Sequence, residues 1–119
     1  MELSKLAESR LMDIIPVFLV AITRDDDVLY MNETMCQMLG YELNEVLHQN
    51  YIHLFVQEEN KAIVQQAFDR VKDGENKSKY ENSLVAKDGQ IIDTEWQGVP
   101  VYQQDGRLDY FFGIGMDVT

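Results

Sequence analysis

The chain is poor in the residues that form cross-links, and positive charge is scarce. Its 119 residues include one cysteine, two prolines and one tryptophan, and 10 lysines and arginines stand against 21 aspartates and glutamates. Cys36 has no second cysteine with which to form a disulfide, which favours a reducing cytoplasmic location. The net charge of −11 repels phosphate backbones and anionic lipid headgroups, so neither nucleic acid nor a membrane surface is expected as a partner.

Long apolar runs and catalytic motifs are also lacking. The longest apolar run, residues 14–22, contains Pro16 and falls far short of the roughly 20 residues that span a bilayer. No Gly-x-Gly-x-x-Gly loop and no Gly-Lys-Ser/Thr sequence occurs. His48 and His53 are five residues apart, which is not the i, i+4 spacing of a helical metal site. We therefore expect no transmembrane helix, no catalytic residue, no metal site and no independent enzymatic activity.

The residues that are present predict one domain preceded by a flanking helix. The hydrophobic content of 45% is enough to bury a single core without disulfides or metals. Residues 1–15 place Leu3, Leu6 and Leu11 on one stripe, which predicts an amphipathic helix ending near Pro16. This stripe suits pairing with a second copy across a two-fold axis, and it equally suits packing on the chain's own sheet. Residues 16–119 are expected to form the domain itself.

The first half of that domain shows strand patterns followed by helix patterns. Residues 17–23 and 28–31 are rich in β-branched and aromatic side chains and flank a polar turn, which predicts a hairpin. Asn32 can cap a short helix that ends at Gly40. Residues 42–55 indicate one or two further helical turns. The strongest helix pattern covers about residues 58–72, with an apolar stripe consisting of Ala62, Ile63, Ala67, Phe68 and Val71.

The second half changes to the period of two that is typical of strands. Its three alternating segments, separated by Asp-Gly turns, are residues 79–86, 90–102 and 107–118. Strands in two blocks with helices between them predict an α+β fold with one antiparallel sheet and the helices on one face. Gly113 and Gly115 fall on one face of the last segment, where glycine indicates close approach by a helix, a partner or a ligand.

Five stretches resemble the PAS domain family in sequence and in order. They are Val28-Leu29-Tyr30-Met31-Asn32, Leu39-Gly40-Tyr41, Lys87-Asp88-Gly89, Asp105-Gly106-Arg107 and Gly113-Ile114-Gly115-Met116-Asp117-Val118-Thr119. The resemblance extends from about Ile14 to the end of the chain. It implies a five-stranded antiparallel sheet in the order 2-1-5-4-3, with helices that enclose a small cavity against one face.

The resemblance also implies a role in signalling. PAS domains bind ligands, relay signals and dimerise upstream of output modules, and the fold alone does not select among these roles. We expect a homodimeric sensory domain of a cytoplasmic bacterial protein that regulates a C-terminal diguanylate cyclase or histidine kinase. The alternative is a dimerisation scaffold that binds no small molecule.

Two cofactors of the family can be tested on particular residues. Photosensory flavin members carry a reactive cysteine in an Asn-Cys-Arg-Phe-Leu-Gln stretch, and Tyr51 stands at the cysteine position of the matching residues 50–55. Haem-binding members use a histidine on the long helix, and residues 58–72 contain none. Cysteinyl-flavin and haem are therefore not expected, whereas an unreactive flavin or a small metabolite remains compatible. His48 stands where many relatives have glycine, so a left-handed backbone is expected there.

The cavity is expected to combine aromatic and polar side chains. Strand alternation places Trp96 on one face with Ile92 and Thr94, where its indole either stacks on a planar ligand in the cavity or packs on the outer face. Asn82 and Tyr51 would hold water or a polar ligand. The complete set of expected cavity residues is Asn32, Met35, Tyr51, Phe55, Phe68, Asn82, Trp96 and Phe112.

The end of the last strand is the expected exit of the signal. Asp117 and Thr119 lie where many PAS domains continue into a signalling helix. Asp117 is expected to contact that linker helix or to cap its N-terminus, and the two roles are compatible.

Overall fold

A computed structural model of the chain describes residues 17–75 and 79–118. The predicted flanking helix with Leu3, Leu6 and Leu11, and the predicted exit residue Thr119, lie outside these ranges. The elements, in chain order, are β1 (Phe18–Thr23), β2 (Val28–Met31), α3 (Glu33–Leu39), α4 (Leu43–Val46), α5 (Tyr51–Phe55), η1 (Glu58–Asn60), α6 (Lys61–Lys72), β3 (Lys79–Val85), β4 (Ile91–Tyr102) and β5 (Leu108–Asp117). No helix within the described ranges is long and apolar enough to cross a membrane.

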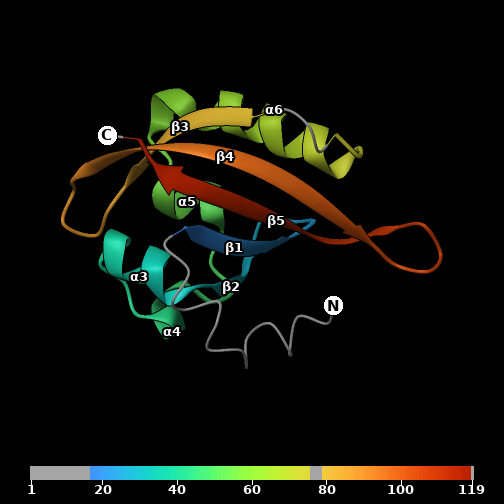
Figure 1. Cartoon of the computed structure of the whole chain (residues 1–119), viewed down its shortest axis with the longest axis horizontal. Helices are drawn as coiled ribbons and strands as arrows, with labels where there is room; N and C mark the ends of the chain where they lie inside the picture. The colour runs from blue at the N-terminus through green and yellow to red at the C-terminus, as the bar shows by residue number, and fades with distance from the viewer. Residues whose placement is uncertain (1–16, 76–78, 119) are drawn as a thin grey trace.

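The strands form one antiparallel sheet in the order β2-β1-β5-β4-β3, which confirms the predicted topology. Figure 1 shows β4 and β5 as the two long strands, with α5 and α6 behind them in that view. The helices and the inner face of the sheet share the main core, which includes Phe55, Val64, Val71, Trp96 and Phe111. A smaller cluster, consisting of Leu19, Ala21, Tyr30 and Tyr110, lies on the outer face.

The three hairpin turns share one backbone geometry. The two predicted Asp-Gly turns place Gly89 and Gly106 at φ angles of 87° and 88°, in the left-handed region that glycine tolerates. In the β1–β2 turn the same position is taken by Asp26, at a φ angle of 72°. The Asp26 carboxylate forms an ion pair with Lys72 Nζ at 2.7 Å and accepts a hydrogen bond from Gln65 Nε2 at 3.1 Å. These contacts fix the C-terminal end of α6 to the hairpin.

The short helices follow the predicted local signals. The side chain of Asn32, which is completely buried, accepts hydrogen bonds from the backbone N–H groups of Leu19 at 3.0 Å and Met35 at 3.2 Å. It therefore caps α3 and also ties it to β1. Gly40 ends α3 at a φ angle of 81°, and His48 adopts the predicted left-handed backbone at 66°.

The long helix differs in detail from its predicted stripe. α6 begins at Lys61, after the 3-10 turn η1, and buries Val64, Ala67 and Val71. Ile63 is 64% exposed and Ala62 is exposed as well, so the predicted place of both in the stripe is wrong. One residue is about 100° of rotation around an α-helix, and that rotation separates Ile63 from the buried Val64.

Candidate functional site

Two rows of residues cross the inner face of the sheet in register. The first row, from β1 through β5 and β4 to β3, consists of Phe18, Gly115, Trp96 and Tyr80. The next row, from β1 through β5 to β4, consists of Val20, Gly113 and Gly98. The glycines carry no side chains, so these rows leave space on the sheet that rings and branched side chains from neighbouring elements fill.

Trp96 fills the space over the β5 glycines. A Cβ atom added at Gly115 would lie 2.6 Å from the indole atoms Cδ2 and Cε3, and one at Gly113 would lie 3.1 Å from Cε3. The ring centroid is 6.1 Å from that of Phe18, and Trp96 is 7% exposed. The indole therefore lies on the inner face, which decides between the two placements that the sequence left open. The group that closely approaches the glycines is a side chain of the adjacent strand.

A chain of hydrogen bonds fixes the orientation of the indole. Trp96 Nε1 donates to Thr94 Oγ1 at 2.7 Å. The Thr94 hydroxyl in turn lies 2.8 Å from the backbone carbonyl oxygen of Asn82 and 3.2 Å from its Oδ1 atom, so it can donate to either. Both polar groups of the pair Trp96 and Thr94 are thus satisfied within the sheet.

A pocket of about 30 Å³ lies between α6 and this part of the sheet. It is lined mainly by aromatic and aliphatic residues, namely Val20, Ile22, Tyr51, Ala67, Phe68, Val71, Tyr80, Asn82, Trp96, Gln97, Gly98, Phe111, Phe112 and Gly113. None of these residues is charged. The volume exceeds the roughly 10–15 Å³ that a cavity needs to hold one water molecule.

Five of the eight predicted cavity residues border this pocket, namely Tyr51, Phe68, Asn82, Trp96 and Phe112. The prediction was wrong for Asn32, Met35 and Phe55, which are completely buried in the core. Asn32 is used to cap α3, and the ring of Phe55 packs edge-on against that of Tyr51, with centroids 5.2 Å apart. Phe55 therefore contacts the pocket wall through Tyr51 without lining the pocket.

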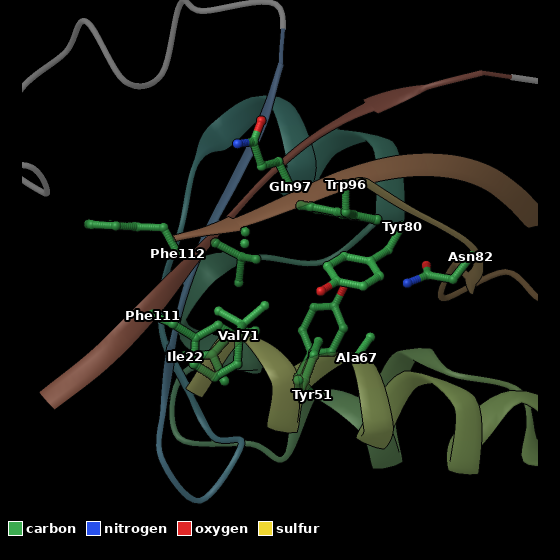
Figure 2. A pocket seen from close by; sticks show the side chains of 14 residues that line it. Ile22, Tyr51, Ala67, Val71, Tyr80, Asn82, Trp96, Gln97, Phe111 and Phe112 are labelled. Atoms are coloured by element: carbon green, nitrogen blue, oxygen red, sulfur yellow. The ribbon is translucent and has the colours of Figure 1, made fainter. Parts of the chain in front are cut away.

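The prediction for Phe112 needs a correction. Although Phe112 borders the pocket, Figure 2 shows its ring pointing away from it. The ring packs edge-on against Tyr110 in the outer-face cluster, with centroids 5.3 Å apart. Phe111 is the β5 phenylalanine whose ring lies inside, 5.0 Å from that of Phe68. The alternation that places Gly113 and Gly115 on one face also places Phe111 there, so the sequence held this information.

Two tyrosines bring hydroxyl groups to the pocket. Tyr51, at the start of α5, is 2% exposed, and burial raises the pKa of its hydroxyl well above the usual range. Tyr80 comes from β3, and its hydroxyl oxygen is buried without a hydrogen-bond partner among the described residues. From α6, the Arg70 guanidinium lies 5.4 Å from the centroid of the Tyr80 ring. Figure 2 shows both tyrosine rings pointing into the pocket.

Sequence reasoning missed Tyr80. The signal was its position two residues before Asn82, which puts both on the same face of the strand. The structure places Asp117, the predicted exit residue, at the end of β5 opposite Thr94. In the described part of the chain, no three or more histidines, cysteines, aspartates or glutamates gather into a metal-binding group.

Comparison with known proteins identifies relatives of this arrangement. A family model described as PAS fold matches residues 6–118. The PAS domain of an HTR-like protein from Haloarcula marismortui is 22% identical, with a TM-score of 0.77 over 97% of this chain and 90% of that chain. A PAS domain from Colwellia psychrerythraea is 21% identical, with a TM-score of 0.82 over 99% and 98%.

A third solved structure is a PAS domain from a two-component sensor histidine kinase. It is 14% identical, with a TM-score of 0.73 over 90% of this chain and 89% of that chain. No curated protein matches the chain. At these identities the solved structures show a shared fold.

Proposed function

The chain belongs to the PAS-fold family, and on that premise we propose that it is a sensory and signal-relay domain of a cytoplasmic bacterial signalling protein. A small molecule binds in the pocket between α6 and the sheet. The resulting change passes to the end of β5 and from there to an output module beyond residue 119. The chain itself regulates and does not catalyse.

One observation supports the relay above all others. Trp96 lines the pocket, and its ring rests on Gly115, two residues before the end of β5 at Asp117. A ligand that shifts the indole therefore moves a ring that is in direct contact with the C-terminal end of β5. A ligand changes such an equilibrium only if its affinities for the two arrangements differ. The close contact between Trp96 and Gly115 couples the two, because the ring cannot move toward β5 without displacing the strand.

The pocket is expected to work without the large cofactors of the family. Its volume of about 30 Å³ is far below the roughly 300–1,000 Å³ of typical sites for drug-sized ligands. Tyr51 replaces the reactive cysteine of photosensory members, and no histidine lies on α6. We therefore propose neither haem nor cysteinyl-flavin as a ligand.

A homodimer is proposed on the outer face of the sheet. Ile114 and Met116, which alternate with the glycines of β5, are 43% and 49% exposed on that face. Such apolar side chains in a row favour contact with a second copy or with the flanking residues. The output module is proposed to be a histidine kinase or a diguanylate cyclase, and the sensor-kinase PAS domain with this fold supports the former.

A scaffold without a ligand is the second candidate, because the pocket is so small. The native mass and the absorbance spectrum of the purified chain at micromolar concentration test both proposals together. We expect the mass of a dimer, and no absorbance at wavelengths longer than the absorption band of the aromatic side chains. A monomer would contradict the dimer, and flavin or haem bands would contradict the proposed small ligand.

A further inference from the structure

The hydroxyl of Tyr80, which lines the pocket, is buried without a hydrogen-bond partner among the described residues. Tyr80 projects from the edge strand β3 and lies opposite Trp96 in the register. Its hydroxyl oxygen has no hydrogen-bond partner in the described part of the chain. By contrast, the indole N–H of Trp96 is already bonded to Thr94, and the Thr94 hydroxyl is directed at Asn82. Tyr80 thus presents an unused donor at the pocket.

The unused Tyr80 hydroxyl indicates that a molecule in the pocket would supply a hydrogen-bond acceptor. A buried hydroxyl without a partner is unfavourable relative to the same group in water, and a hydrogen bond relieves that cost. The remaining wall around Tyr80 is apolar, with Phe68, Phe111 and Val71 among the lining residues. A molecule with one hydrogen-bond acceptor and an otherwise apolar surface fits both features.

The charge of the lining excludes ions. No charged residue lines the pocket, so an ion would lose its hydration there without gaining a partner of opposite charge. The net charge of −11 further opposes anions. The burial that raises the pKa of Tyr51 keeps that hydroxyl uncharged as well. The lining therefore favours a neutral molecule.

The packing around the pocket limits the size of the ligand. α6 lies directly on β4 at Gly98, where an added Cβ atom would overlap the side chain of Val71. On the other side, Trp96 rests on Gly113 and Gly115. The pocket can therefore grow mainly at Tyr80 and Asn82, which are half-buried on the edge strand. Displacement of these side chains would enlarge the pocket toward the solvent.

We propose that the pocket binds a small, uncharged, largely apolar molecule with one hydrogen-bond acceptor, which accepts a hydrogen bond from the Tyr80 hydroxyl. This inference rests on the proposed function, that is, on the pocket taking a small ligand. It adds the chemical class of the ligand and the residue that selects it.

Three probes of similar shape test the class, namely cyclohexanone, methylcyclohexane and cyclohexanecarboxylate. Trp96 is the only tryptophan, so its indole N–H gives a single resonance that reports on the pocket in a nitrogen–proton correlation spectrum. Each probe is titrated into the chain, into Tyr80→Phe and into Tyr102→Phe. Tyr102 is the matched control, because it is 46% exposed and does not line the pocket.

We expect cyclohexanone to bind about three- to tenfold more tightly than methylcyclohexane, as one hydrogen bond of ordinary strength provides. Tyr80→Phe removes this preference, Tyr102→Phe retains it, and the carboxylate binds weakest of the three. Equal affinity of ketone and hydrocarbon, tighter binding of the carboxylate, or an unchanged preference in Tyr80→Phe would overturn the proposed class while ligand binding stands. If no probe shifts the Trp96 resonance at millimolar concentration, the proposed ligand-binding function fails together with it.

Discussion

Replacing Gly115 by alanine tests the contact on which the relay depends. An alanine Cβ atom at this position would lie 2.6 Å from two carbons of the Trp96 indole. Atoms in folded proteins do not approach so closely, and the backbone of β5 is held by pairing to β1 on one side and β4 on the other. The indole must therefore shift, although its N–H is bonded to Thr94 and its other edge meets Phe18.

The expected size of the effect follows from two opposing terms. Overpacking a well-filled core costs about 1–3 kcal/mol. Replacing a glycine in a strand by alanine recovers about 0.5–1 kcal/mol, because the unfolded chain loses conformational freedom. We expect Gly115→Ala to lower the free energy of unfolding by about 1–2 kcal/mol. For a domain of this size, each kcal/mol of lost unfolding free energy lowers the midpoint of thermal unfolding by about 4 °C. The midpoint of Gly115→Ala should therefore fall by about 4–8 °C.

Thermal unfolding followed by circular dichroism measures this change, and the emission of the single tryptophan reports whether the indole has moved. Gly113→Ala is the matched control, because its added Cβ atom would lie 3.1 Å from the same ring and needs only a small adjustment. Its midpoint should fall less than that of Gly115→Ala. An unchanged or higher midpoint for Gly115→Ala, with unchanged emission, would refute the close packing of Trp96 on β5.

Three further predictions concern buried polar groups. Asp26→Asn should lower the free energy of unfolding by about 1–3 kcal/mol in urea titrations, because the mostly buried ammonium of Lys72 loses its anionic partner. Since burial raises the pKa of Tyr51, unfolding above pH 10 releases its proton, so stability falls as the pH rises. The contribution is up to about 1.4 kcal/mol per pH unit, and Tyr51→Phe should lack it. Tyr80→Phe should raise the free energy of unfolding by about 1 kcal/mol, because it removes the buried hydroxyl without a partner.

Each of these has a control in the same chain. Asp69→Asn removes a largely exposed carboxylate 3.8 Å from the same Lys72 Nζ atom and should have little effect. An equal loss in both variants would contradict a specific role of Asp26. For Tyr51, identical slopes above pH 10 in the original chain and in Tyr51→Phe would show that the buried hydroxyl does not cause the decrease. A Tyr80→Phe chain less stable than the original would mean that the hydroxyl has a partner.

The sequence predicted the fold well because local chemistry specifies most of its elements. The turns at Gly89 and Gly106 and the cap at Asn32 follow from neighbouring residues, whereas the left-handed backbone at His48 was predicted from the glycine that many relatives have at this position. The exception is informative. Ile63 belongs to a helix whose pattern was evident, yet its exposure depends on where η1 ends and α6 begins.

The pocket was harder to predict because it depends on how the elements pack together. Alternation along β4 groups Trp96 with Thr94 but does not tell which face is covered by helices. That choice follows from the register that sets Gly115 beside Trp96, a contact between strands 19 residues apart in sequence. Asn32 and Phe55 have side chains suited to a ligand site, but capping and core packing use them instead.

If the proposed relay exists, a ligand in the pocket alters the end of β5 through Trp96. Backbone amide resonances recorded with and without saturating cyclohexanone test this relay. The predicted result is a change at Trp96 that continues through Gly115 to Asp117, while the distant turn at Gly89 stays unchanged. Changes confined to the pocket lining, with Gly115 and Asp117 unaffected, would contradict the claim.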